Sequence, residues 1–216
     1  IKEIFIPYYT CPSVWQALKK ENCRINFYHI DSNFLPTVDF DKESFILYTN
    51  YFGICAKNVK EMAQKYKNLI VDNAQAFYMP KFGVASFNSI RKFFGTPDGA
   101  LLYCDRKSEQ IFEQDISYER LFHLLKRIDV SAEFGYLDFC KSENTLVGKE
   151  IKLMSKLTKY LFNSINIEKA KQKRLENFKF LDNELFSSNE LNINIDNDDV
   201  PMVYPYFSKN KNLIMN

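Results

Sequence analysis

The chain has 216 residues, of which 46% are hydrophobic, including 20 Phe and 13 Tyr. This composition is sufficient for a buried core and argues against a disordered chain. The formal net charge is only +2, so charge gives no indication of a nucleic-acid partner or of binding to an anionic membrane. No apolar run is long enough to cross a membrane, and the first residues do not resemble a signal peptide. We therefore expect a folded cytoplasmic protein with no nucleic-acid or membrane partner.

The cysteine and histidine content argues against a disulfide framework and against a metal site. The five cysteines are widely spaced and none forms a CxxC pair, and the chain has only two histidines. Such a pattern is typical of a protein in a reducing cytoplasm. No metal is expected.

Short runs of β-branched and aromatic residues alternate with helical patterns in the first half of the chain. We expect strands over residues 3–6, 25–30, 45–49, 69–72 and 100–104. Helices are expected after Thr10 and over residues 58–67, where Asn58 and Glu61 form a capping box. This alternation predicts an α/β fold, a three-layer α/β/α arrangement whose mostly parallel sheet is covered by helices on both faces. In such sheets, ligands bind at the carboxyl ends of the strands.

The pattern changes near residue 110. A helix is expected over residues 110–127, and a longer one over residues 166–186. Residues 187–199 are rich in Asn, Asp and Ser and predict a loop with at most one strand. Residues 202–206 predict the start of a further strand.

The domain organisation follows from this change of pattern. We expect a large α/β domain over residues 1–127, followed over residues 128–216 by a linker helix and part of a small α+β domain. The sequence begins at Ile1 within a strand and ends at Asn216 without a capping element. We therefore expect it to be a fragment, or the ordered part of a longer protein.

Two charged residues are the main candidates for chemistry. Asp72 ends an apolar strand at the rim of the predicted sheet, and Lys92 follows in a Ser-Ile-Arg-Lys turn. Pyridoxal phosphate (PLP) requires both residue types, because an acid beside its pyridine nitrogen keeps the ring an electron sink and an amine forms a Schiff base with its aldehyde. The neighbouring Arg91 and two phenylalanines favour the neutral amine that this chemistry needs. Taken singly, a helix cap or an exposed acid is the commoner role for Asp72, and a solvated surface position is the commoner one for Lys92.

Four further residues could complete such a site. Ser89 precedes Lys92 by one turn and could donate to a phosphate, and Gln75 could reach the phenolic oxygen of the ring. Tyr9 and Cys11 follow the first strand and could flank a flat ring. Each of these residues is also compatible with an ordinary turn or packing role.

Taken jointly, six segments in order resemble the DegT/DnrJ/EryC1/StrS family of PLP-dependent sugar aminotransferases, which share the fold of aspartate aminotransferase (fold type I). The similarity extends over most of the chain. The matching segments are Ile6-Pro7-Tyr8-Tyr9-Thr10, Phe27-Tyr28-His29-Ile30-Asp31, Thr49-Asn50-Tyr51-Phe52-Gly53, Val71-Asp72-Asn73-Ala74-Gln75, the lysine loop from Ser89-Ile90-Arg91-Lys92 to Pro97-Asp98-Gly99, and Lys173-Arg174-Leu175-Glu176-Asn177-Phe178.

The resemblance implies a role for each matched position. Lys92 would form the internal aldimine and move the proton, Asp72 would hold the pyridinium, Gln75 would contact the ring hydroxyl and Ser89 the phosphate. Lysine at position 92, where dehydratases of the family have histidine, implies a transaminase. The implied reaction passes an amino group, commonly from glutamate, to a keto-sugar on a nucleotide for surface polysaccharide or glycan synthesis. The resemblance also implies a homodimer with a shared active site.

Two other hypotheses remain open. The family's helix start that cradles the phosphate would precede Ile1, and its asparagine-containing loop is matched only by Ser117-Tyr118-Glu119-Arg120, which has no asparagine. These departures favour a non-catalytic relative that acts as a binding or scaffold protein. An unrelated parallel α/β protein that binds a nucleotide is a third hypothesis, although the six glycines include no Gly-rich phosphate loop.

Overall fold

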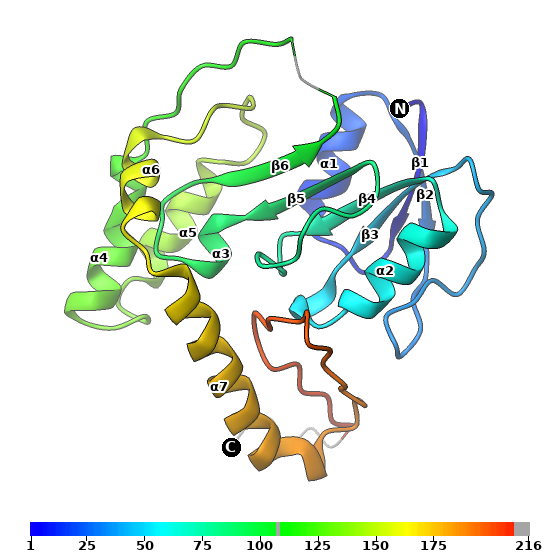
Figure 1. Cartoon of the computed structure of the whole chain (residues 1–216). Helices are drawn as coiled ribbons and strands as arrows, with labels where there is room; N and C mark the ends of the chain where they lie inside the picture. The colour runs from blue at the N-terminus through cyan, green and yellow to red at the C-terminus, as the bar shows by residue number, and fades with distance from the viewer. Residues whose placement is uncertain (107–108, 210–216) are drawn as a thin grey trace.

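The computed structural model describes residues 1–106 and 109–209, and a sheet with the strand order β2-β1-β3-β4-β5-β6 lies at its centre (Figure 1). All neighbouring strands from β2 to β5 are parallel, and β6 is antiparallel to β5. The expected mostly parallel sheet is therefore confirmed. The strands are β1 (Glu3–Pro7), β2 (Arg24–Tyr28), β3 (Phe45–Thr49), β4 (Asn68–Asn73), β5 (Ala85–Ser89) and β6 (Ala100–Cys104).

Alternating side chains of the central strands build an apolar layer on each face of the sheet. On one face, Ile46 and Tyr48 of β3 belong to a core cluster with residues of helix α2 (Ala56–Lys65). On the other face, Leu47 belongs to a cluster against which Trp15 of helix α1 (Pro12–Lys20) packs. Successive side chains of a strand point to opposite faces, and Figure 1 shows α1 and α2 on either side of the sheet. The expected three-layer α/β/α arrangement is confirmed.

The sequence does not predict β5, because its buried residues are polar. Ser86 is 1% exposed and Asn88 is 3% exposed, since both lie between β4 and β6. The Asn88 side chain accepts a hydrogen bond from Leu101 N (3.3 Å). A search for apolar alternation misses a strand of this kind.

The expected start of helix α2 is wrong by two residues, because its cap comes from far along the chain. The backbone N–H of Ala56 donates to Asp199 Oδ1 (2.8 Å), which satisfies a donor at the helix N-terminus. Asn58 does not cap the helix; its amide donates to Asn33 O (2.8 Å) and to the Tyr48 hydroxyl (3.1 Å). Local spacing cannot reveal a cap supplied from residue 199.

The helix expected over residues 110–127 is wrong in its first part. The helical segment begins with the 3-10 turn η2 (Tyr118–Leu121) and continues as α4 (Phe122–Asp129). Upstream, Asp115 N donates to Leu153 O (2.9 Å) and Leu153 N donates to Glu113 O (2.8 Å). Bonds to a distant segment thus replace the local bonds that a helix needs.

The helices of the second half are α5 (Tyr136–Asn144), α6 (Lys156–Asn163) and α7 (Ile167–Leu185), followed by the 3-10 turn η3 (Phe186–Ser188). The long helix expected over residues 166–186 is confirmed, and the Asn166 side chain caps it by accepting from Lys169 N (2.8 Å). The sequence does not predict α5 and α6. Among the described residues, no helix combines the length and apolar character that crossing a membrane requires.

The strand expected over residues 202–206 is absent from the described part of the chain. The Asn189 side chain donates to Pro205 O (3.0 Å) and accepts from Phe207 N (3.0 Å). An amide side chain therefore makes the backbone bonds that a neighbouring strand would make. The loop expected over residues 187–199 is confirmed apart from the short turn η3.

The short helix α3 (Ile90–Phe93) between β5 and β6 joins the two halves of the chain. Ile90, Phe93 and Phe94 are buried in a third cluster, against which Phe162 of α6 and Ala170 of α7 pack. The Arg174 guanidinium of α7 also donates to Phe93 O (2.8 Å). Lys92, the lysine that we expect to bind the cofactor, therefore lies on a helix that the second half of the chain holds in place.

Candidate active site

A cavity of about 240 Å³ lies at the carboxyl ends of the central strands. It brings together five of the six expected site residues. Ser89, the sixth, is not among the residues that line it. The lining residues are Tyr9, Thr10, Cys11, Thr49, Tyr51, Asp72, Gln75 and Lys92.

Asp72 lies near the end of β4 and is 5% exposed. It is paired in register with Thr49 of β3, so both side chains point to the face of the sheet that α1 covers. Its Oδ1 accepts a hydrogen bond from Ala74 N (2.8 Å). Burial raises the pKa of Asp72, and the Ala74 N–H and the Lys92 ammonium partly offset this. Because Asp72 is buried, the alternative interpretation that it is an exposed surface acid is wrong.

Lys92 reaches the cavity from α3, and its neighbours are fixed by packing. Phe93 and Phe94 are buried, whereas Lys92 is exposed. Arg91 forms an ion pair with Glu143 of α5. The Arg91 charge, which we expected to disfavour the Lys92 ammonium, is thus compensated by a carboxylate.

Gln75 holds the turn that forms one wall of the cavity. This turn is the 3-10 segment η1 (Tyr51–Gly53), in which Phe52 has φ 57° and Gly53 has φ 73°. Gln75 Oε1 accepts from Phe52 N (2.9 Å), and Phe52 O accepts from Met202 N (2.8 Å). The Gln75 amide nitrogen keeps its two donors for a ligand.

We expect Gly53→Ala to destabilise the protein by about 2 kcal/mol or more. A Cβ atom at Gly53 would lie 2.6 Å from Gln75 O and 2.7 Å from Val200 O, and φ +73° is itself unfavourable for alanine. Urea denaturation measures the effect. Gly148→Ala is the matched control, since Gly148 has φ +67° and nothing within 4 Å of its Cβ position. Equal losses in the two variants would show that the contact with Gln75 and Val200 is unimportant.

Aromatic rings border the cavity on the side of β1. Tyr9 stacks on Tyr51 with ring centroids 5.5 Å apart, and the Tyr51 hydroxyl donates to Tyr9 O (3.0 Å). Tyr8 points elsewhere and stacks on Phe27 and His29. The Cys11 thiol accepts a hydrogen bond from the Ser13 hydroxyl (3.2 Å).

The cavity contains hydroxyl groups that the sequence did not single out. Thr10 Oγ1 is buried and has no hydrogen-bonding partner among the described residues, and Thr49 Oγ1 is buried beside the Tyr51 hydroxyl. Buried hydroxyls are normally paired, so unpaired ones indicate a ligand or ordered water. Together with a buried acid, an amine and amide donors, they fit the anionic, carbonyl and ring-nitrogen groups of PLP. Thr49 ends a predicted strand, and both threonines lie in segments that resemble the aminotransferase family, but the sequence assigns neither of them a role.

Comparison with known proteins establishes the fold. No protein-family model matches the sequence, and no curated protein matches it. Among solved structures, a DegT DnrJ EryC1 StrS aminotransferase from Brucella abortus is similar with a TM-score of 0.56 and 12% identity over 98% of this chain. The sugar aminotransferase CalS13 from Micromonospora echinospora is similar with a TM-score of 0.54 and 14% identity over 94% of this chain. The chain spans 60% of the length of each of these proteins.

This similarity confirms the expected fold, an α/β arrangement around a mostly parallel sheet like that of these two structures. At 12% and 14% identity, a shared fold does not carry an activity with it.

Proposed function

We propose that this chain binds PLP in the cavity around Asp72 and Lys92 and belongs to an aminotransferase that acts on a sugar. The observation that carries the proposal is the presence of a buried acid and a lysine in one cavity at the carboxyl edge of a parallel sheet. The fold shared with two aminotransferase structures supports it. We further propose a keto-sugar, nucleotide-linked, as the acceptor and glutamate as the donor, in surface polysaccharide or glycan synthesis.

Each of the two charged residues has one task in this proposal. Bound PLP supplies an electron sink for the reacting amine. Asp72 holds a proton on the ring nitrogen, because a carboxylate whose burial disfavours its charge gains most from a cationic partner. Lys92 holds the cofactor covalently through Nζ and carries a proton to and from the reacting carbon.

The remaining expected residues position the ring. Gln75 donates from its amide nitrogen to the phenolic oxygen while its carbonyl oxygen stays on Phe52. Tyr9 and Cys11 flank the ring, since both line the cavity. We propose that the Ser89 hydroxyl reaches the phosphate, and that the buried hydroxyls of Thr10 and Thr49 provide further polar contacts.

We also propose that two copies of the chain associate and complete each other's site. Several large apolar side chains are exposed within residues 116–137, from just before η2 into α5, and a subunit interface would cover them. They include Ile116 (74% exposed), Ile128 (81%) and Leu137 (71%). In this proposal, residues 1–127 bind the cofactor, residues 128–216 begin a small domain, and the enzyme works in the cytoplasm.

Borohydride reduction in the presence of PLP tests the proposal. We expect a covalent PLP adduct on Lys92, located by peptide mass spectrometry, because reduction fixes the linkage between an amine and the cofactor. Lys92→Ala should abolish the adduct, whereas Lys179→Ala, on the exposed side of α7, should not change it. An adduct that persists in Lys92→Ala, or no adduct in the wild-type protein, would contradict the proposal.

A non-catalytic relative that acts as a binding or scaffold protein is the second candidate. It is favoured by one observation, that Ser89 does not line the cavity, so the expected phosphate contact is unsupported. The same trapping experiment separates the two candidates when it is combined with an assay of amino-group transfer. Adduct formation with turnover contradicts the scaffold, and an absence of both contradicts the enzyme.

A further inference from the structure

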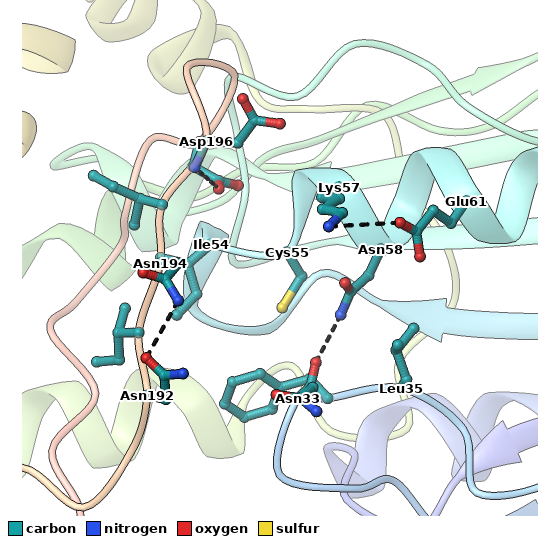
Figure 2. Close-up of a pocket in the computed structure, with 14 residues that line it drawn as sticks. Asn33, Leu35, Ile54, Cys55, Lys57, Asn58, Glu61, Asn192, Asn194 and Asp196 are labelled. Carbon is teal, nitrogen blue, oxygen red and sulfur yellow. Dashed lines mark hydrogen bonds and ion pairs between the residues drawn. The ribbon is translucent and has the colours of Figure 1, made fainter.

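A second cavity, of about 520 Å³, lies between three segments that are far apart in the sequence (Figure 2). Its walls are the loop 33–35, the start of α2 and the loop 192–199. It shares no lining residue with the candidate active site. The Phe34 ring on its wall packs against Tyr51, which lines the first cavity, with centroids 5.5 Å apart. The two cavities are therefore neighbours separated by an aromatic wall.

Four asparagine side chains supply hydrogen-bonding groups in this cavity. Asn192 Oδ1 accepts from Asn194 Nδ2 (3.2 Å), which leaves the Asn192 amide nitrogen and the Asn194 carbonyl oxygen for a ligand. Asn58 uses its amide nitrogen on Asn33 O and on Tyr48, which leaves its carbonyl oxygen. The lining thus offers both a free donor and free acceptors, and Figure 2 shows the bonds that Asn194 makes to Asn192 and Asn58 makes to Asn33. A ligand with several hydroxyl groups matches these amide donors and acceptors, because each hydroxyl group can both donate and accept a hydrogen bond.

The other part of the lining is apolar. The loop 33–35, which carries two of the apolar side chains, is fixed by hydrogen bonds. Phe34, Leu35, Ile54 and Ile193 all line the cavity. Phe34 has φ 63°, which is uncommon for a bulky residue, and its loop is fixed by Asp31 Oδ1, which accepts from Leu35 N (2.9 Å) and from Asn33 N (2.8 Å). An apolar wall of this kind suits the C–H face of a sugar ring.

The charge of the lining disfavours anionic ligands. Three carboxylates, of Glu61, Asp196 and Asp199, line the cavity with a single ammonium group, that of Lys57. Lys57 is paired with Glu61 at 4.0 Å, and Lys60, which does not line the cavity, lies 3.8 Å from Asp196, so the negative charge that remains is small but not cancelled. An added phosphate or carboxylate would be repelled, whereas a neutral polyol or an amine would not.

We propose that this second cavity is a saccharide site that takes a neutral or amino-bearing monosaccharide ring, separate from the site of PLP. The hydroxyl groups of the sugar bind the amides of Asn58, Asn192 and Asn194, and the apolar face of the sugar ring lies on Phe34. The proposal does not depend on the proposed aminotransferase activity. A ligand of this size in an open cavity should bind with a Kd on the order of 1 mM.

Saturation-transfer NMR with glucosamine, glucose and glucuronate tests the proposal on the full chain. We expect glucosamine and glucose to bind, and glucuronate to bind roughly tenfold more weakly or not at all. The double variant Asn192→Ala/Asn194→Ala should weaken glucosamine binding by roughly tenfold or more, since it removes two amide partners. Both residues are exposed on a loop, so the fold should remain intact.

Two control variants make the result decisive. Asn197→Ala changes an exposed asparagine of the same loop that does not line the cavity, and should leave binding unchanged. Lys92→Ala should also leave saccharide binding unchanged, so a failure of the PLP proposal is seen separately. No binding of any probe at millimolar concentration, tightest binding of glucuronate, or equal binding by the double variant would each overturn the proposal.

Discussion

Replacing Asp72 with asparagine should weaken PLP binding by roughly tenfold to a hundredfold, the usual value of a hydrogen bond to a charged group. The same variant without cofactor should be at least as stable as the wild-type protein at neutral pH. Burial raises the pKa of Asp72, so the folded protein bears a cost for the charged carboxylate. Asparagine removes that charge and can still accept from Ala74 N, the bond that Asp72 Oδ1 makes. Function and stability should therefore change in opposite directions.

The difference in free energy of unfolding between Asp72→Asn and the wild-type protein should depend on pH in a definite direction. A carboxylate with a raised folded-state pKa contributes stability below its unfolded pKa and loses it as the pH rises through the folded pKa. The free energies of unfolding of Asp72→Asn and wild type should thus be similar below about pH 4. The advantage of the variant should grow towards neutral pH. Urea denaturation at several pH values measures this.

Asp199→Asn is the matched control for Asp72→Asn. Burial also raises the pKa of Asp199, but its carboxylate binds Ala56 N and Asp196 N, outside the candidate active site. PLP affinity, followed by fluorescence titration, should therefore be unchanged in Asp199→Asn. A loss of affinity of the same size in both variants, or none in Asp72→Asn, would contradict a contact between Asp72 and the ring nitrogen.

The sequence predicts those parts of the fold whose signal is local. The strands β1, β2, β3, β4 and β6 follow from apolar and aromatic runs, and α7 follows from a periodic pattern with a local cap at Asn166. The start of α2 could not be predicted, because its cap is Asp199. The segment at residues 202–206 reads as a strand but is held by the Asn189 side chain, which no pattern in the segment itself reveals.

The same division applies to the candidate site. Asp72 and Lys92 could be identified because each follows a strand or turn that the sequence predicts, and the cavity contains both. Thr10 could not be identified, since an unpaired buried hydroxyl is a property of the folded protein alone. The second cavity was missed because one of its three walls, the loop 192–199, carries no motif of its own.

Asp98→Ala should destabilise the protein by about 3 kcal/mol or more, because it leaves several buried donors without an acceptor. Asp98 is 7% exposed and accepts from Ser155 N (2.8 Å), from Ser155 Oγ (2.9 Å) and from the Thr158 hydroxyl. Ser155 in turn caps α6 by accepting from Thr158 N (3.0 Å). The urea concentration at the midpoint of unfolding measures the loss.

Asp98→Ala should also affect Lys92 at temperatures where the variant is still folded. The Asp98 carboxylate binds the start of α6, and the carbonyl of the next residue, Gly99, accepts from Ile90 N at the start of α3 (3.1 Å). We therefore expect slower borohydride-trapped labelling of Lys92 by PLP, because the lysine is less firmly positioned. Asp105→Ala is the control, since Asp105 is an exposed acid paired with Lys81, and its loss should cost less than about 1 kcal/mol. If Asp98→Ala unfolds at the same urea concentration as Asp105→Ala and is labelled equally fast, Asp98 does not couple α6 to the lysine helix.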